Sequence, residues 1–171
     1  IGSGMSPKLP WSKYFFELIL NIKSTKPKVF DAGMLHYLVS ISPLKNKLKN
    51  TVITPHIGEA ATLLNTNTQS IENDRFSAIE KLTTTYNTTS ILKGKGTLIQ
   101  SPKKLISLCP CGNPYMATAG MGDMLTGIIA SYLGQKYSTQ LACEIAVWDH
   151  ANKADELLKL GKIPMLASDI F

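Results

Sequence analysis

A segment rich in glycine has the residue types of an anion-binding site. It runs from Cys111 to Asp123 and leads into a helix predicted to start near Asp123. Gly120 and Gly122 leave the backbone unobstructed, and the free N–H groups at the start of a helix point towards whatever binds there. The helix dipole adds partial positive charge, so a phosphoryl group is the natural occupant. Asp123 would stand beside that phosphate, where a carboxylate can accept a proton from an attacking hydroxyl.

The same residues also allow a structural interpretation. Asp123 could cap the helix while the two glycines make a turn. The segment is not a Walker loop, because no Lys-Ser/Thr pair follows, and it is not a Rossmann fingerprint, because the third glycine is missing. Residue types alone leave both interpretations open.

A second loop, Thr54–Glu59, joins a predicted strand to a predicted helix. Pro55 and Gly58 bend the chain and expose His56 at the edge of the sheet. A lone histidine is more often structural than functional, and a carboxylate such as Glu59 suits the first turn of a helix through the macrodipole alone. A ligand-binding His56 and a Glu59 that helps hold a metal-bound water are the functional alternative.

A third loop, Lys93–Thr97, reads Lys-Gly-Lys-Gly-Thr after a short apolar strand. A β-turn with two surface lysines explains these residue types. The functional alternative is close approach of the backbone to the phosphates and ribose of a nucleotide, with Lys93 as counter-charge.

Helical and strand patterns alternate along the chain. The predicted strands are Lys28–Asp31, Thr51–Thr54 and Ser90–Lys93, followed by a hairpin-like pair, Thr97–Gln100 and Leu105–Leu108. The predicted helices are Trp11–Ile22, Met34–Ser40, Gly58–Leu64 and Ser70–Tyr86, with two long ones starting near Asp123 and Ser138. This order predicts an α/β layered fold with a mostly parallel central sheet flanked by helices. Ligands of such sheets gather at the carboxyl ends of the strands, where Asp31, Thr54 and Lys93 stand.

Apolar residues on the first and last helices are expected to be buried. On the first helix they are Trp11, Phe15, Leu18, Ile19 and Ile22. On the last they are Leu141, Ile145, Trp148 and Leu157.

Composition sets the broad class. The 171 residues are 44% hydrophobic and 18% charged, which excludes a disordered tail and suits one domain with a substantial core. No apolar run is long enough for a transmembrane helix, so no membrane partner is expected. The net charge of +6 comes from scattered lysines, clustered only at Lys45, Lys47, Lys49 and Lys103–Lys104, and from a single arginine, so nucleic-acid binding is not expected.

The three cysteines, Cys109, Cys111 and Cys143, are interpreted as structural thiols. Their odd number argues for a reducing, cytoplasmic location. The Cys-x-Cys pair has no second pair to complete a zinc site, and no residue is assigned as a metal ligand.

Five segments together resemble a known family. Asn113–Ala130 resembles the signature of the ADP/ATP-dependent NAD(P)H-hydrate dehydratases, of the YjeF C-terminal domain type in the ribokinase-like superfamily. Thr54–Ala60 is similar to its T-P-H-x-G-E-x loop and Lys93–Thr97 to its K-G-x-G-T loop. Val29–Ala32 resembles its strand ending in D-A-D, and Ile1–Met5 resembles its G-P-G-L-G turn. The resemblance covers essentially the whole chain in the order of the family.

The resemblance implies a metabolite-repair lyase that restores hydrated NADH or NADPH through phosphorylation of the ring hydroxyl and loss of phosphate. ADP or ATP would be the co-substrate with Mg²⁺ as cofactor, and a homo-oligomer is implied. The implied catalytic base is Asp123, and the anion hole is formed by Gly120, Met121 and Gly122. The implied substrate-binding residues are Gly4, His56 and Asp123, and the nucleotide-binding residues are Lys93, Gly94, Lys95, Gly96, Thr97 and Gly122.

The chain also departs from the family pattern. Gly33 stands where the family has a second acidic residue, and Ser3 replaces a proline. Residues 1–171 are interpreted as one ribokinase-like domain, the C-terminal two-thirds of the family domain, with its N-terminal units missing. Two alternatives therefore remain: a catalytically incompetent fragment that binds adenine nucleotide, and another ribokinase-like small-molecule kinase.

Overall fold

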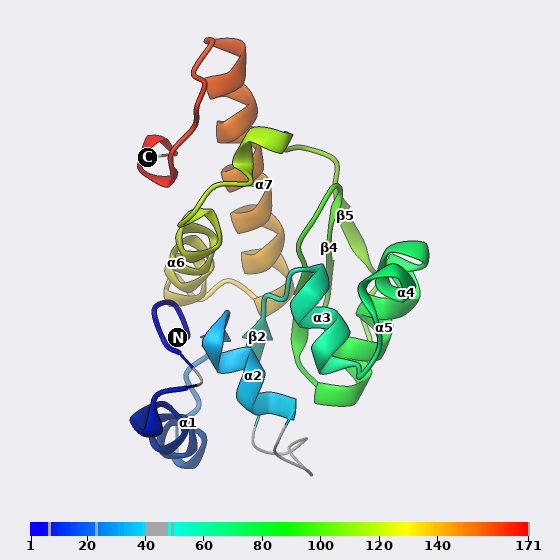
Figure 1. The fold of residues 1–171 in the computed structure, drawn as a ribbon, viewed down its shortest axis with the longest axis vertical. Coiled ribbons are helices and arrows are strands. Elements are labelled where there is room, and N and C mark those ends of the chain that lie inside the picture. Colours follow the sequence, from blue (N-terminus) through cyan, green and yellow to red (C-terminus); the bar gives the residue numbers. More distant parts are fainter. Residues whose placement is uncertain (7, 23, 40–47, 49, 171) are drawn as a thin grey trace.

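A five-stranded sheet lies at the centre of the computed structural model, which describes residues 1–6, 8–22, 24–39, 48 and 50–170 (Figure 1). The strands, in order across the sheet, are β1 (Lys28–Phe30), β2 (Thr51–Ile53), β3 (Thr89–Leu92), β4 (Thr97–Gln100) and β5 (Ser107–Cys109). The first three strands pair in parallel, whereas β4 pairs antiparallel with both β3 and β5. The α/β fold is confirmed, with the parallel strands and the terminal hairpin in their predicted order.

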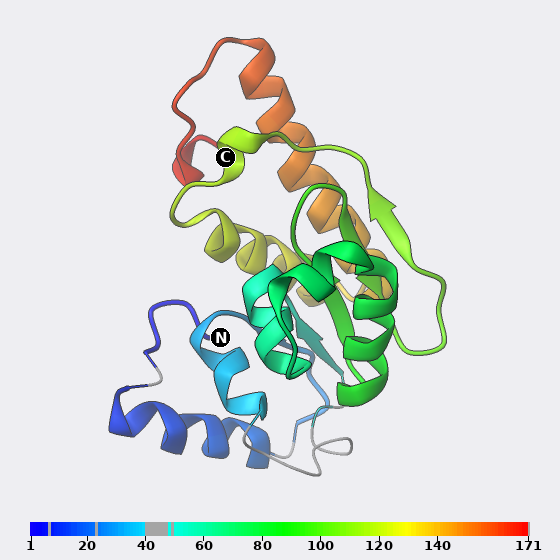
Figure 2. The ribbon, with the colours of Figure 1, turned by 45° about the vertical axis from the view of Figure 1, so that its right-hand side comes forward.

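Helices cover both faces of the sheet. One layer holds α1 (Pro10–Asn21), α2 (Gly33–Val39), α3 (Ile57–Leu63), α4 (Thr68–Asn73) and α5 (Arg75–Tyr86), and the other holds α6 (Met121–Gly134) and α7 (Thr139–Lys159). Figure 2 shows the α6–α7 pair, in yellow to orange, against the sheet and opposite α3 and α5. Short 3₁₀ turns at Pro114–Met116 and Ala167–Asp169 complete the described elements.

Alternate residues of each strand pack into two separate hydrophobic cores, one on each face of the sheet. Successive side chains of a strand point to opposite faces, so neighbours in sequence join different helical layers. Phe30, Ile53, Leu92 and Leu98 pack with α1–α5, and Val29, Val52, Ile91 and Ile99 pack with α6 and α7. Burial of these strands on both faces explains why the residues named are apolar in consecutive pairs.

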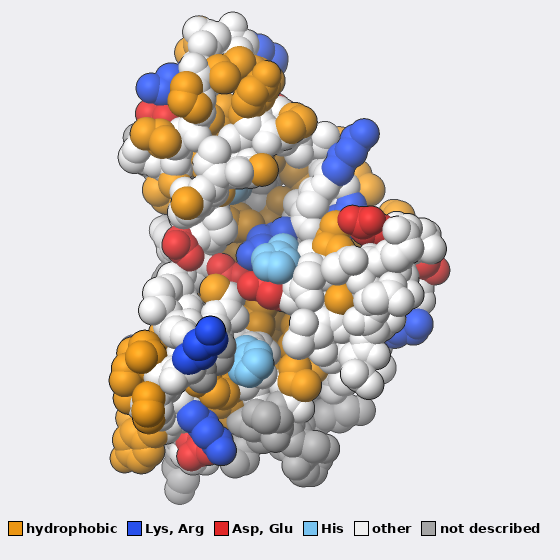
Figure 3. All heavy atoms as spheres, in the orientation of Figure 1, with side chains coloured by type: hydrophobic (Ala, Val, Ile, Leu, Met, Phe, Trp, Pro, Cys, Tyr) orange, Lys and Arg blue, Asp and Glu red, His pale blue; other side chains and the backbone are white. Residues whose placement is uncertain are grey.

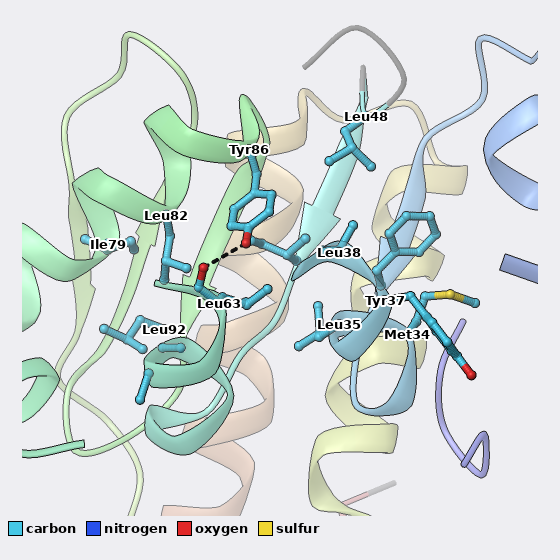
Figure 4. Close-up of a cluster of buried hydrophobic side chains, with 14 of the residues drawn as sticks. Met34, Leu35, Tyr37, Leu38, Leu48, Leu63, Ile79, Leu82, Tyr86 and Leu92 are labelled. Carbon is cyan, nitrogen blue, oxygen red and sulfur yellow. Dashed lines mark hydrogen bonds between the residues drawn. The ribbon is translucent and has the colours of Figure 1, made fainter. Parts of the chain in front are cut away.

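The first core, under α2, α3 and α5, also satisfies its buried polar groups. The Tyr86 hydroxyl donates to the Leu63 carbonyl oxygen at 2.8 Å, the dashed line in Figure 4. Leu82 and Ile79 of α5 point into the same cluster. This bond ties the end of α5 to the end of α3, because a buried hydroxyl without a partner would cost free energy.

The predicted burial of α1 is wrong in part, although Phe15 and Ile19 are partly buried and pack against the core as predicted. Trp11, Leu18 and Ile22 are about half exposed, whereas Phe16 and Leu20 are buried. Phe16 packs on the Tyr37 and Phe30 rings, with centroid separations of 5.5 and 5.9 Å. Because α1 carries apolar residues around more than one face, the helical period alone could not say which stripe the sheet would cover.

The predicted burial of α7 is also wrong in part. Leu141 and Trp148 are exposed to 42% and 50%. The buried stripe is made of small residues and one histidine: Ala142, Cys143, Ala146, Val147, His150, Ala151 and Ala154. Small side chains let α7 lie close to α6 and the sheet, so the bulky residues remain outside.

Some predicted boundaries shift as well. The single helix expected over Ser70–Tyr86 is two helices, because Asp74 leaves the helical conformation and its side chain accepts the Ser77 N–H at 2.9 Å. The last strand begins at Ser107, and Leu105 is 90% exposed. Lys45, Lys47, Lys49 and Ser40, named in the sequence predictions, lie outside the described residues. No helix among the described residues is long and apolar enough to cross a membrane.

Candidate functional site at the carboxyl edge of the sheet

The carboxyl ends of β1, β2 and β3 meet at one edge of the sheet. Asp31, Thr54 and Lys93 follow these strands directly. Backbone bonds hold the following loops together: Thr54 N–H donates to the Phe30 carbonyl at 3.2 Å, and Lys93 N–H donates to the Pro55 carbonyl at 2.9 Å. Asp31, Thr54 and Lys93 therefore lie together at one edge of the sheet, as the sequence predicts.

Lys93 is the centre of the cluster. Its Nζ lies 2.9 Å from Asp31 Oδ1 and 3.9 Å from Glu59 Oε2. Asp31 is almost completely buried, and its other oxygen accepts a hydrogen bond from the Thr126 hydroxyl of α6 at 3.2 Å. One carboxylate thus links the ends of β1 and β3 to the helix behind the glycine-rich segment. In Figure 3, acidic, basic and histidine side chains gather around a hollow at mid-height of the molecule.

His56 begins α3 as its N-terminal cap. Its Nδ1 accepts the N–H groups of Gly58 and Glu59 at 3.0 and 3.2 Å. In return the Glu59 carboxylate accepts the His56 N–H at 2.8 Å, which completes a capping box. Because Nδ1 accepts, the proton of the neutral ring is on Nε2, which is 3.5 Å from Glu59 Oε1. His56 is both a structural cap and an exposed donor at the site.

The first turn of α6 forms the opposite wall. Gly120 precedes the helix with a left-handed φ of 86°, and Met121 is buried. A Cβ on Gly122 would lie 3.4 Å from Lys93 Nζ, so the lysine sits directly beside this backbone. Asp123 is exposed, and no described residue hydrogen-bonds or ion-pairs with its carboxylate. A free carboxylate beside helix N–H groups suits proton transfer next to a bound phosphoryl group.

The Lys93–Thr97 loop is held by the only arginine. Arg75 donates to the Leu92 carbonyl at 3.1 Å and to the Lys95 carbonyl. Gly94 has a φ of +146°, and a Cβ there would lie 3.2 Å from Arg75 Nη2. Burial lowers the pKa of the Arg75 guanidinium. Only glycine combines this backbone conformation with such close contact.

Asp155 of α7 holds the glycine-rich segment. Its carboxylate accepts the Gly112 N–H at 2.8 Å and the Asn113 side-chain amide at 2.9 Å. One turn earlier on α7, His150 is buried in the same helix face that packs against α6. Burial lowers the pKa of His150, which favours the neutral imidazole. The Asp155 side chain of α7 therefore anchors the start of the segment.

The N-terminal turn lies against the same edge. Met5 N–H donates to the Gly2 carbonyl at 3.0 Å, and Gly4 has open space around it. A Cβ on Gly2 would lie 1.7 Å from the Asp31 carbonyl oxygen. A Cβ on Gly33 would lie 1.9 Å from the Met5 carbonyl oxygen, so an acidic residue at position 33 does not fit this packing.

Several contributors were not found from the sequence. Asp155 and Thr126 are separated from the residues they hold by tens of positions, and Arg75 lies outside the motifs of the site. Asp31 was identified as a strand-end residue, but its link to Lys93 was not. The position of Asp31 at the end of a strand is the signal in the sequence that points to its place in the site.

Comparison with known proteins decides the family. The sequence model of the NAD(P)H-hydrate dehydratase family matches residues 1–171. The chain belongs to this family. The bifunctional NAD(P)H-hydrate repair enzyme Nnr of Coxiella burnetii is 38% identical over 172 residues, which is 100% of this chain and 34% of that protein. The ADP-dependent (S)-NAD(P)H-hydrate dehydratase of Neisseria meningitidis is 37% identical over 157 residues, 89% of this chain and 53% of that protein.

Two solved structures share the fold of this chain. Bacillus subtilis YxkO superposes with a TM-score of 0.86 at 25% identity, over 99% of this chain and 61% of that one. The ADP/ATP-dependent NAD(P)H-hydrate dehydratase of Bacillus subtilis, co-crystallised with ATP/Mg²⁺, superposes with a TM-score of 0.82 at 24% identity, over 97% of this chain and 59% of that one. The chain thus spans about a third to a half of the two relatives described above and about three-fifths of these two solved structures.

Proposed function

We propose that this dehydratase-family chain repairs hydrated NADH or NADPH in a reaction that consumes ADP or ATP. The observation that carries the proposal is the meeting of Lys93 with the first turn of α6, where Nζ is 3.4 Å from the Cβ position of Gly122. A cation and helix N–H groups side by side favour a phosphoryl group. The Asp123 carboxylate on the same turn, which has no partner among the described residues, would supply a base.

The two ligands would occupy different sides of this centre. The nucleotide would contact Lys93, Gly94, Lys95, Gly96 and Thr97, whose backbone Arg75 holds, and the Gly122 backbone. The hydrated nicotinamide would lie towards His56, Gly4 and Asp123, where the His56 Nε2–H is available to donate.

The chain's own residues would act in a fixed order. Asp123 would take the proton of the ring hydroxyl as its oxygen attacks the terminal phosphorus of the nucleotide. The backbone N–H groups of Gly120, Met121 and Gly122 would stabilise the charge on the transferred group. The nucleotide would leave with one phosphate fewer, and elimination of inorganic phosphate from the new ester, with loss of a proton from the neighbouring ring carbon, would then restore the C=C bond of the ring.

The donor set fits Mg²⁺ carried by the nucleotide. Mg²⁺ prefers oxygen ligands and commonly uses one or two carboxylates together with substrate phosphates. Among the residues that the structure describes, no three His, Cys, Asp or Glu side chains could enclose a metal ion. Glu59, whose Oε2 is 3.9 Å from Lys93 Nζ, is the carboxylate placed to hold a metal-bound water. When bound, Mg²⁺ would neutralise phosphate charge.

An absorbance assay tests the proposal. The protein is mixed with hydrated NADPH, Mg²⁺ and either ADP or ATP, and the return of the reduced-nicotinamide absorbance is followed. Recovery that depends on a nucleotide is expected, and the similarity to the ADP-dependent dehydratase of Neisseria meningitidis supports ADP as the donor. Equal recovery without nucleotide would contradict the proposal.

A second candidate function is adenine-nucleotide binding without turnover. It is favoured by one observation, the coverage of only 61% of the solved Bacillus subtilis structure. Binding of ADP without any recovery of NADPH would support it.

We also propose that the protein is a homo-oligomer in a reducing cytoplasm. The free thiols of Cys109, Cys111 and Cys143 support the reducing compartment.

A further inference from the structure

Lys93 already has a carboxylate partner where a phosphate would bind. Its Nζ is 2.9 Å from Asp31 Oδ1, and both groups lie under Gly122, whose Cβ position is 3.4 Å from Nζ and 3.6 Å from Asp31 Oδ2. An anion held by the N–H groups of this turn would therefore meet the Lys93 ammonium and, just behind it, the Asp31 carboxylate.

Asp31 is fixed on every side. Its N–H donates to the Ile1 carbonyl at 3.0 Å, and its carbonyl accepts the Met34 N–H at 3.1 Å. Gly2 lies against the same carbonyl so closely that a Cβ would be 1.7 Å away. Oδ2 accepts from Thr126 at 3.2 Å. The carboxylate cannot withdraw when an anion arrives, whereas Lys93 sits on a flexible stem.

In this arrangement Asp31 and a bound phosphate would compete for the Lys93 ammonium. Asp31 and Glu59 are two carboxylates facing one ammonium, at 2.9 and 3.9 Å. A phosphate bound at Gly122 must share the ammonium with Asp31, and burial leaves the attraction between Asp31 and Lys93 poorly screened.

We infer that Asp31 is a positioning residue that acts through Lys93 as an internal counter-ion and competes with phosphate for the ammonium. It holds Lys93 beside Gly122, and it lowers the affinity of the site for the phosphate that the reaction releases. The inference rests on the proposed function, because it assumes that phosphates bind at Gly122.

Binding measurements on the full chain test it with three probes: ADP, inorganic phosphate and adenosine. Asp31→Asn keeps the shape and an oxygen acceptor but removes the charge. We expect it to bind ADP and phosphate about fivefold more tightly, as a charge-assisted bond is freed for the ligand. Adenosine, which carries no phosphate, should bind as it does to the unaltered chain. In turnover assays the nucleotide KM and kcat should both fall, whereas simple structural damage would raise KM.

Two further variants separate charge from architecture. In a Lys93→Met background, Asp31→Asn should no longer tighten ADP binding. The ammonium for which Asp31 and the phosphate compete is then absent. Thr126→Val removes one hydrogen bond to Asp31 but keeps its charge, so it should not tighten ADP binding. Tightening that persists without Lys93, or ADP binding that Asp31→Asn weakens or leaves unchanged, would overturn the inference.

A crystal structure of the unaltered chain with ADP keeps the test independent of variant folding. Lys93 Nζ should lie within hydrogen-bond distance, about 3 Å, of a phosphate oxygen. A phosphate bound away from Lys93 would refute the inference but not the repair activity. Failure of the unaltered chain to bind either ADP or phosphate would refute both.

Discussion

Asp155 accepts the backbone N–H of Gly112 at 2.8 Å, a contact between residues 43 positions apart. The same carboxylate accepts from Asn113, so one side chain of α7 fixes the start of the glycine-rich segment. The end of that segment is the first turn of α6. The position of the anion site therefore depends on α7 as well as on its own glycines.

Asp155→Asn should loosen this segment. The amide replaces an acceptor with a donor, which leaves Gly112 or Asn113 unpaired, and hydrogen bonds to charged groups contribute about 1.5–3 kcal/mol. We expect the nucleotide KM to rise about tenfold, in line with that energy. Glu156→Gln is the matched control, because Glu156 makes an exposed pair with Lys153 at 3.6 Å, and such pairs contribute about 0–1 kcal/mol. Equal effects of the two variants would contradict the anchoring role.

Asp123→Asn should separate binding from turnover. The carboxylate has no partner among the described residues, so the amide should disturb neither the fold nor the helix start. Loss of a general base lowers the rate by about 10²–10⁴-fold. ADP affinity, measured by calorimetry, should remain the same. Undiminished repair by this variant would remove Asp123 from its role as base.

Gly94→Ala should destabilise the protein, and Gly127→Ala should not. Gly94 has a φ of +146° and lies against Arg75, where alanine would add strain of about 1–3 kcal/mol. Gly127 lies inside α6 with open space around it, and alanine there should stabilise by about 0.5–1 kcal/mol. Chemical denaturation of both variants measures the difference. Destabilisation of the two by similar amounts would show that the Gly94 conformation is unimportant.

Stability should fall as the solution is acidified through the titration of His150. Burial lowers the pKa of His150 from 6.5, so below that value the unfolded chain binds a proton that the folded chain resists. The free energy of unfolding should therefore rise with pH up to about 6.5, the ordinary histidine pKa. Urea unfolding of the protein and of His150→Gln over this range isolates the contribution. A pH dependence equal in both would assign it to other groups.

The three thiols should react at different rates. Cys143 is fully buried, and burial raises its pKa to about 12, whereas Cys111 is half-buried. Burial also raises the pKa of the Cys109 thiol. Because the thiolate is the reactive form, a thiol reagent at neutral pH should label Cys111 first. Cys111→Ser should remove this fast phase, and rapid labelling of Cys143 would contradict its burial.

The order of elements followed from the sequence because each strand and helix has a local signal. Lys28–Phe30, Thr51–Ile53 and Thr89–Leu92 are short apolar runs ended by polar residues, and these ends place Asp31 and Lys93 at one edge. The exposed Trp11 and Trp148 were misassigned to the core. Hydrophobicity says that a side chain gains by burial, but not whether another layer is present to cover it.

The sequence by itself determined the α/β fold, the three loops of the site and the family to which they belong. Only the tertiary structure decided which side chains hold those loops. Asp31 meets Lys93 across 62 positions, and Thr126 meets Asp31 across 95. Such contacts have no local period or motif, because they arise only when parallel strands bring their ends together and α6 packs behind them. The physical reason is the short reach of a hydrogen bond or ion pair, which depends on distance in space rather than on separation along the chain.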